Sequence, residues 1–322
     1  MDIGYYLELI SRKLLEWFWG RHYCNQRSIN MLKKTAFMPL ALLLAGSLTA
    51  CTVGGVVDPS LPSAQEVIGA VVESMSDMGT YQFESNMIMS VAGEADGESF
   101  EMTMDMTLTG AIDIENRQMA ADITMGVEMP GQDDMDMGMA VYVVNDTVYT
   151  NMDFFGFGPT WVKSEITDEA WDEMSQMAEL VEPYVELLEA AQVRVTGIEQ
   201  VAGVDCYVLE LTPDMDQLWQ LVMQQAEMTA TEMPAPTEDF ISEMFRDFSV
   251  KQWVSKDTFF ITRVVINMSV ELTPEEMGFP DEDGVLRMDI LMYLLAHDYN
   301  QPVSISLPPG AAYAVEAEAG WE

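Results

Sequence analysis

Cysteine and histidine are scarce in this chain, with three cysteines and two histidines among 322 residues. So few cysteines exclude a scaffold held together by disulfides. Cys206 is the only cysteine after residue 51 and lies in the strand-like run Val204–Leu209, so we interpret it as a small buried hydrophobe. His297 is the only histidine after residue 51, and we expect it to have a hydrogen-bonded structural role.

Catalytic signatures are also missing from the sequence. A Ser-His-Asp or Cys-His arrangement needs a histidine beside a nucleophile. No Gly-x-Ser-x-Gly, phosphate-loop or His-Glu-x-x-His motif occurs. The acidic turns at 132–136 and 281–284 lack the spacing of a calcium loop. The sequence therefore predicts a protein that is not an enzyme, with no catalytic residue, no metal site and no cofactor.

Basic residues are few, with 14 Lys and Arg against 54 Asp and Glu. Six of the basic and three of the acidic residues precede Cys51, so the net charge from Cys51 onward is near −43. This excess argues against nucleic acid as a partner, because basic residues drive phosphate binding. It also argues against a chain that lies flat on anionic lipid. A solvated surface and a cationic partner both remain open.

The sequence has no apolar run near its start that is long enough to span a bilayer, which takes ~20 residues. Instead, Met31–Lys34 is positive, Phe37–Ala45 is a short apolar core, and Leu48-Thr49-Ala50-Cys51 follows. This order is typical of a secretory signal. Its end resembles the lipobox of bacterial lipoproteins. The resemblance implies cleavage specificity at Leu48 and Ala50, and a lipid-modified Cys51 as the new N-terminus.

The start of the chain divides into three expected segments. Residues 31–50 are the lipoprotein signal peptide and 51–62 are a tether. Residues 1–30 precede a complete signal, so they indicate a start codon assigned too far upstream, or else a membrane-surface helix. The lipid on Cys51 would anchor the exported protein to the extracytoplasmic face of a cell membrane.

Period-two alternation of apolar and polar residues dominates the next part of the chain, as in antiparallel sheets with one apolar face. Ser63–Glu66 has capping-box spacing and predicts a helix to about Met78. Gly93–Gly97, Glu115-Asn116, Pro130–Asp134 and Asn145-Asp146 are the expected turns. The strands predicted between them are 81–91, 102–108, 119–129, 135–143 and 148–152.

The rest of the chain mixes helices and strands. We expect helices at 167–191, 216–225 and 240–248, with a low-complexity loop at 226–239. Further strands are predicted at 192–199, 204–212, 249–256, 258–272 and 285–299. The fold class is therefore α+β, with a strongly curved antiparallel sheet or partial barrel, because long consecutive one-faced strands favour curvature. One domain is expected over 63–308, followed by a loose tail at 309–322.

This order of elements resembles the LolA/LolB-like and LppX/LprG-like lipoproteins. Tyr81–Ser85 at the start of the first strand, Val148-Tyr149, and the segment Gly158–Lys163 (GPTWVK) carry the local similarity, and the pattern extends over 63–306. The resemblance implies a half-open β-barrel with helices covering its concave apolar face. It also implies a binding role, because several members of these families hold lipid chains on that face.

Methionine is unusually abundant, at 28 residues. Unbranched, polarizable side chains repack around varied apolar shapes, although an ordinary core could also use them. Thioethers also suit Cu(I), but alternate residues of one strand lie ~6.5–7 Å apart, so copper would need ligands from neighbouring strands. The predicted ligand-binding residues are Phe83, Met87, Met89, Met102, Met104, Met106, Met125, Met137 and Met139.

The sequence thus predicts a membrane-anchored extracytoplasmic lipoprotein that binds or carries an apolar ligand, such as a lipid or an acyl chain. The alternative is an envelope sensory or protein-interaction lipoprotein with a filled core and no ligand. The protein partner in that case is not indicated by any motif.

Overall fold

The structure, a computed structural model, describes residues 60–95, 98–131, 134–154, 160–168, 170–171, 191–213, 245–273 and 284–316. Two helical elements are described over their full length in these ranges, α3 (Ala64–Ser76) and the 3-10 helix η1 (Pro309–Tyr313). The strands are β1 (Thr80–Ala95), β2 (Glu98–Asp113), β3 (Gln118–Glu128), β4 (Met135–Val144), β5 (Thr147–Phe154), β6 (Thr160–Glu165), β7 (Ala191–Val201), β8 (Val204–Pro213), β9 (Phe245–Ser255), β10 (Ile261–Leu272), β11 (Gly284–His297) and β12 (Val315–Glu316).

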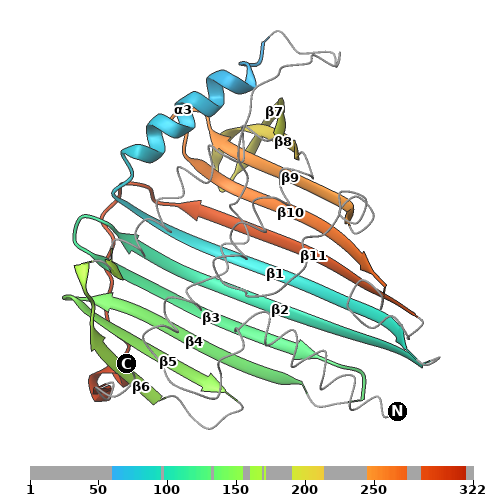
Figure 1. Ribbon diagram of the computed structural model, residues 1–322. Helices are drawn as coiled ribbons and strands as arrows, with labels where there is room; N and C mark the ends of the chain where they lie inside the picture. The colour runs from blue at the N-terminus through green and yellow to red at the C-terminus, as the bar shows by residue number, and fades with distance from the viewer. Residues whose placement is uncertain are drawn as a thin grey trace.

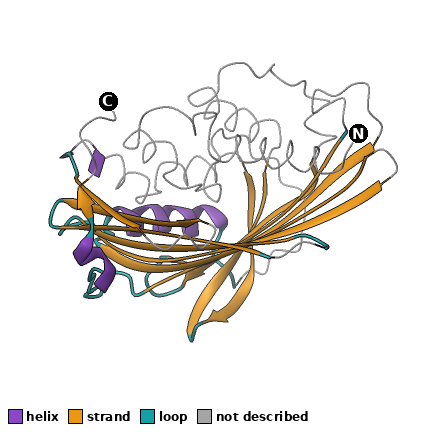
Figure 2. Ribbon diagram, turned by 90° about the horizontal axis from the view of Figure 1, so that it is seen from below, coloured by secondary structure: helices purple, strands orange, loops and turns teal. Residues whose placement is uncertain are grey.

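All of these strands join one sheet, in the order β12-β6-β5-β4-β3-β2-β1-β11-β10-β9-β8-β7 (Figure 1). Strands β1 to β6 form one meander and β7 to β11 form another. The antiparallel pairing of β1 with β11 joins the two meanders over 14 residue pairs, from Gln82 and His297 to Ala95 and Gly284. The described sheet is open and strongly curved (Figure 2), which confirms the predicted curved antiparallel sheet.

Two tight hairpins show how local sequence sets the register. Asn145 and Asp146 have φ values of 52° and 56°, between the paired residues Val144 and Thr147. A two-residue hairpin loop needs positive φ at both positions, and Asn and Asp tolerate that conformation better than most residues. This confirms the turn predicted at Asn145-Asp146. Ala202-Gly203 makes the equivalent turn between β7 and β8, with φ values of 49° and 87°.

Helix α3 begins with the predicted capping box. The Ser63 backbone N–H donates to Glu66 Oε2 at 2.8 Å, and the Glu66 N–H donates to Ser63 Oγ at 3.3 Å. Val67, Val71 and Met75 form the buried stripe of the helix. They pack against one face of β8 to β10, through residues Leu209, Leu211, Val250, Val254, Ile261 and Val264. The helix thus packs on one end of the sheet, and its bounds agree with the helix predicted from Ser63 to about Met78.

The other predicted covering helices fall largely outside the described residues. The helix expected at 167–191 is described only at its start, where Thr167 Oγ1 accepts the Ala170 N–H at 3.1 Å and residues 168, 170 and 171 are helical. Trp171 is buried there against Val141, Val143 and Val148. Residues 216–225 and 226–239 are outside the described ranges, so helical cover of the concave face stays a prediction.

Three boundary predictions are wrong. Gly93 to Ala95 continue β1 instead of turning, because they pair with both β2 and β11. Residues 245–248 belong to β9 and not to a helix, because pairing with β10 extends that strand.

The third correction concerns the tail. Residues 309–316 form η1 and β12, and β12 pairs in parallel with β6. Lys163 Nζ lies 2.9 Å from Glu316 Oε1, and Gly310 packs closely on the Trp161 ring. These contacts hold residues 309–316 against β6, so this part of the tail is not loose.

Residues 317–322 lie outside the described part of the chain, as do Leu48, Ala50 and Cys51. Within the described part, no helix is long and apolar enough to cross a membrane.

Candidate ligand-binding face

The sheet has one face that is apolar across its central strands, which we call the apolar face. Directly opposed residues in paired strands place their side chains on the same face of the sheet. Starting from Met87 on β1, the register therefore assigns the alternate residues of each neighbouring strand to this face. On β1, β2, β3, β4, β10 and β11 these residues are almost all aliphatic, aromatic or methionine.

One line of side chains across the apolar face consists of methionine on five neighbouring strands. Met292 on β11 lies opposite Met87 on β1, which lies opposite Met106 on β2. Met106 lies opposite Met125 on β3, which lies opposite Met137 on β4. We call these five residues the methionine row. They are brought together by register from sequence positions as far apart as 87 and 292.

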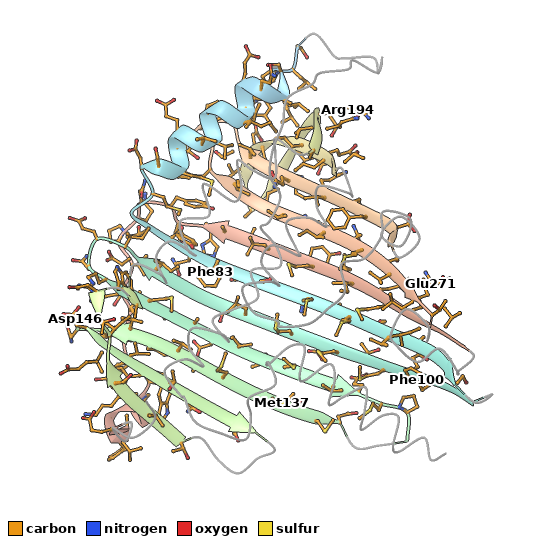
Figure 3. All side chains as sticks on the ribbon, viewed as in Figure 1. Phe83, Phe100, Met137, Asp146, Arg194 and Glu271 are labelled. Carbon is orange, nitrogen blue, oxygen red and sulfur yellow. The ribbon has the colours of Figure 1, made fainter. Side chains whose placement is uncertain are left out.

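The remaining predicted residues lie beside the methionine row on the same face. Met89 is opposite Met104, and Val91 is opposite Met102. On the other side of the methionine row, Leu108 lies opposite Ile123, and Ile123 lies opposite Met139. Phe83 on β1 and Phe100 on β2 lie toward opposite ends of these two paired strands (Figure 3). All nine predicted residues therefore share one face, although their role in binding stays a prediction.

Exposure differs along this face. Met87 is 1% exposed, Met89 is 2% exposed and Val91 is fully buried. Phe83, Met102, Met104, Met106, Met125, Met137 and Met139 are half-buried. Three central β1 side chains therefore belong to the packed interior, and the larger group on β2 to β4 keeps partly accessible surface.

The sequence identified strand β11 but not its place in this face. Leu286, Met288, Ile290, Met292 and Leu294 alternate along it and lie opposite β1 residues of the apolar face. On β10, Ile266 and Met268 extend the face by one more strand. The alternation of apolar and polar residues predicts each of these strands. It does not reveal that β1 pairs with β11, because that pairing joins segments about 200 residues apart.

Aromatic rings close the face at the end of β1 nearest α3. The rings of Phe260 and Tyr299 stack with centroids 4.3 Å apart, and Tyr81 stacks on Tyr299 at 5.8 Å. Burial raises the pKa of both tyrosines, so their phenols stay protonated. The Tyr299 hydroxyl donates to the Ile261 carbonyl at 2.6 Å. This end of the apolar face is therefore filled by protein.

The opposite face of the sheet is chemically different. Here Arg263 lies over the rings of Trp253 and Tyr293, at 4.7 and 5.6 Å from their centroids. Trp253 Nε1–H donates to Glu199 Oε2 at 2.8 Å, and Lys251 pairs with Glu210 at 3.0 Å. On β8 and β9 these groups stand beside a buried apolar cluster that includes Cys206, Val208 and Trp253. On β2 and β3 this face carries polar residues such as Thr107 and Thr124. The contrast between the two faces singles out the apolar face as the candidate site.

In the described part of the chain, His297 and Cys206 were the residues considered for catalysis from the sequence. His297 Nδ1 lies 2.9 Å from Asp298 Oδ2, and its Nε2 lies 4.0 Å from Glu84 Oε1. Burial raises the pKa of the Cys206 thiol, which opposes thiolate formation. No group of three His, Cys, Asp or Glu residues in the described ranges could hold a metal ion.

Comparison with known families matches residues 63–311 to a family of unknown function, DUF6612. The chain belongs to this family. The DUF6612 match extends from the capping box of α3 to η1 and spans the whole described sheet except β12. No curated protein sequence matches the chain.

Among solved structures, the chain is similar to the lipoprotein LppX of Mycobacterium tuberculosis, with 12% identity and a TM-score of 0.32. That alignment covers 76% of this chain and 100% of LppX. A LolA superfamily protein of Nitrosomonas europaea has 11% identity and a TM-score of 0.21, with 77% of this chain and 96% of that chain covered.

Proposed function

We propose that this DUF6612 protein is a non-enzymatic binding protein, tethered outside a cell membrane, that shelters an apolar ligand on its apolar face. The ligand class is a lipid or another molecule with an acyl chain. The tether is the lipid-modified Cys51, which the preceding signal supports. Of the residues predicted from sequence, those proposed to contact the ligand are the half-buried Phe83, Met102, Met104, Met106, Met125, Met137 and Met139. Met87 and Met89 belong to the packed interior.

The half-buried methionines on β2 to β4 are the observation that carries this proposal. Met106, Met125 and Met137 are adjacent through strand register and remain partly accessible. Water contact with adjoining apolar side chains is unfavourable, so an apolar occupant that covers them is stabilised. An acyl chain needs no polar partner, and the unbranched thioether side chains can adapt to its shape.

A second function is favoured by a different observation. Met87, Met89 and Val91 are 1%, 2% and 0% exposed, as expected if the centre of the face is a filled core. In that case the protein is a sensory or protein-interaction lipoprotein without a ligand. The two functions differ in whether an apolar molecule remains bound to the protein when it is purified.

Native mass spectrometry of the protein purified from its own host tests the proposal. A mass excess that organic solvent removes, and that is identified as a lipid, is the expected result. A protein mass accounted for by the chain and its anchor alone, together with no uptake of an apolar fluorescent probe, would contradict ligand binding and support the filled core. The covalent lipid on Cys51 also adds mass. A Cys51→Ser variant produced without the signal peptide carries no such lipid, so its mass serves as the reference for the chain alone.

A further inference from the structure

The methionine row is divided by exposure. Met292 and Met87, on β11 and β1, are 7% and 1% exposed. Met106, Met125 and Met137, on β2 to β4, are half-buried. Chemically identical side chains in one continuous row thus fall into a shielded pair and an accessible trio.

This division has a chemical consequence because a thioether reacts with peroxide. The sulfur lone pair attacks one peroxide oxygen, an S–O bond forms and the O–O bond breaks. Sulfur loses two electrons and becomes the sulfoxide, and hydrogen peroxide is reduced to water. The product is polar and chiral where the reactant was apolar and flexible. Reaction requires access of the oxidant to sulfur, which the trio allows and the shielded pair opposes.

The surroundings of the trio make a sulfoxide unfavourable under an apolar ligand. Met125 has Met106 and Met137 opposite it on the two neighbouring strands. Ile123 and Val127 precede and follow it on the same face of β3. None of these side chains carries an N–H or O–H group. A sulfoxide oxygen at Met125 would therefore find no hydrogen-bond donor among these four side chains, and an apolar ligand placed against them would leave the oxygen unsatisfied.

We propose that Met106, Met125 and Met137 are oxidation sites, and that their conversion to sulfoxides by peroxide releases the apolar ligand from this face. The inference rests on the proposed function and adds its regulation. An exported protein with this arrangement holds its ligand under reducing conditions and loses it under oxidant stress. Enzymatic reduction of the sulfoxides restores binding, since the reaction leaves the carbon skeleton unchanged.

The modification itself is tested by timed exposure of the folded protein to hydrogen peroxide, followed by peptide mass mapping. Met106, Met125 and Met137 are expected to gain one oxygen at least about tenfold faster than Met87 and Met89, because of their access to solvent. Equal rates in the native protein would overturn the assignment of these sites. Equal rates in urea are expected and show that the fold, not the peptide sequence, causes the difference.

The switch is tested by binding of an apolar fluorescent probe before and after oxidation. Oxidised protein is expected to bind about tenfold more weakly or worse, and treatment with methionine sulfoxide reductases and dithiothreitol should restore binding. A triple variant, Met106→Leu, Met125→Leu and Met137→Leu, keeps the volume and the apolar character. Its affinity for the probe before oxidation serves as its own reference, and this affinity should fall little on oxidation.

The matched control is the double variant Met87→Leu and Met89→Leu, which should stay as sensitive to peroxide as the unaltered protein. Loss of sensitivity only in this control would assign the switch to Met87 and Met89 and overturn the proposal. Probe binding that survives oxidation of all three sites contradicts the switch alone. No probe binding before oxidation contradicts the proposed function itself, so the two failures are distinguishable.

Discussion

Met106 on β2 lies directly opposite Met125 on β3, and both side chains are half-buried on the apolar face. The pair joins two strands whose polar residues, such as Thr107 and Thr124, are also opposed but lie on the other face. One register thus sorts the two strands into an apolar and a polar surface. A shift by a single residue would exchange the two surfaces, so the pairing is the basis of the candidate site.

Gly110→Ala should destabilise the fold. A Cβ at Gly110 would overlap a Phe83 ring carbon and would lie 2.5 Å from the Ala120 carbonyl oxygen. Overpacking of this kind costs about 1–3 kcal/mol. Urea unfolding should therefore show a lower midpoint with an unchanged slope. The variant also displaces the ring of Phe83, which is one of the predicted ligand contacts.

Gly138→Ala is the matched control on β4, since no heavy atom lies within 4 Å of its added Cβ. This change should leave the free energy of unfolding unaltered or raise it by about 0.4–1 kcal/mol, through lower entropy of the unfolded chain. Equal destabilisation by the two substitutions would contradict the close packing of Phe83 on Gly110.

Asp289 should make stability depend on pH in the acid range. Hydrogen bonds from Ser269 and then from Arg287 hold the pKa of this carboxyl below its ordinary value of 3.8. The carboxylate therefore stabilises the fold above that value, and the stabilisation is lost as pH falls through the folded-state pKa. The side chain is 46% exposed, so the effect is screened by solvent and stays below about 1 kcal/mol.

The check for Asp289 is thermal unfolding of Asp289→Asn between neutral pH and about pH 2. The variant should unfold at a lower temperature than the unaltered protein at neutral pH, and the gap should close in acid. If the difference in unfolding temperature between the two proteins stays constant across this pH range, the charge of the Asp289 carboxylate does not cause it.

Cys51→Ser should block lipid attachment and leave an uncleaved precursor, because the serine hydroxyl is a much weaker nucleophile than the thiol. Intact mass and detergent partitioning of the expressed protein measure the outcome. Normal cleavage before residue 51, with partition into the detergent phase, would contradict a lipid anchor at this position. Thr52→Ser provides a control that alters the neighbouring residue and keeps the thiol.

The sequence was sufficient for the local structure of the sheet. Alternation correctly placed the alternating apolar residues of β1 to β4 on one face of the sheet, because side chains alternate along every strand. The capping box at Ser63 located the start of α3, and Asn145-Asp146 located a hairpin. In each case the signal lies within a few residues of the structure that it specifies.

Features that depend on distant partners were not predictable in this way. Gly93 has the composition of a turn, yet pairing with Leu286 keeps it in β1. Phe248 fits a helical pattern but pairs with Met268 in β9. Val315 becomes a strand only because Val162 lies beside it. The methionine row likewise needed the β1–β11 pairing, so Met292 was absent from the predicted site.

The central claim is that the apolar face, and not the sheet as a whole, binds an apolar ligand. Met106→Asp and Thr107→Asp place the same charge on adjacent β2 residues that face opposite sides. The decisive measurement is the affinity of both variants for an apolar fluorescent probe, after circular dichroism shows that each is folded. Met106→Asp should bind the probe at least about tenfold more weakly, and Thr107→Asp should bind it like the unaltered protein. Equal affinities in the two folded variants would contradict the assignment of the ligand to this face.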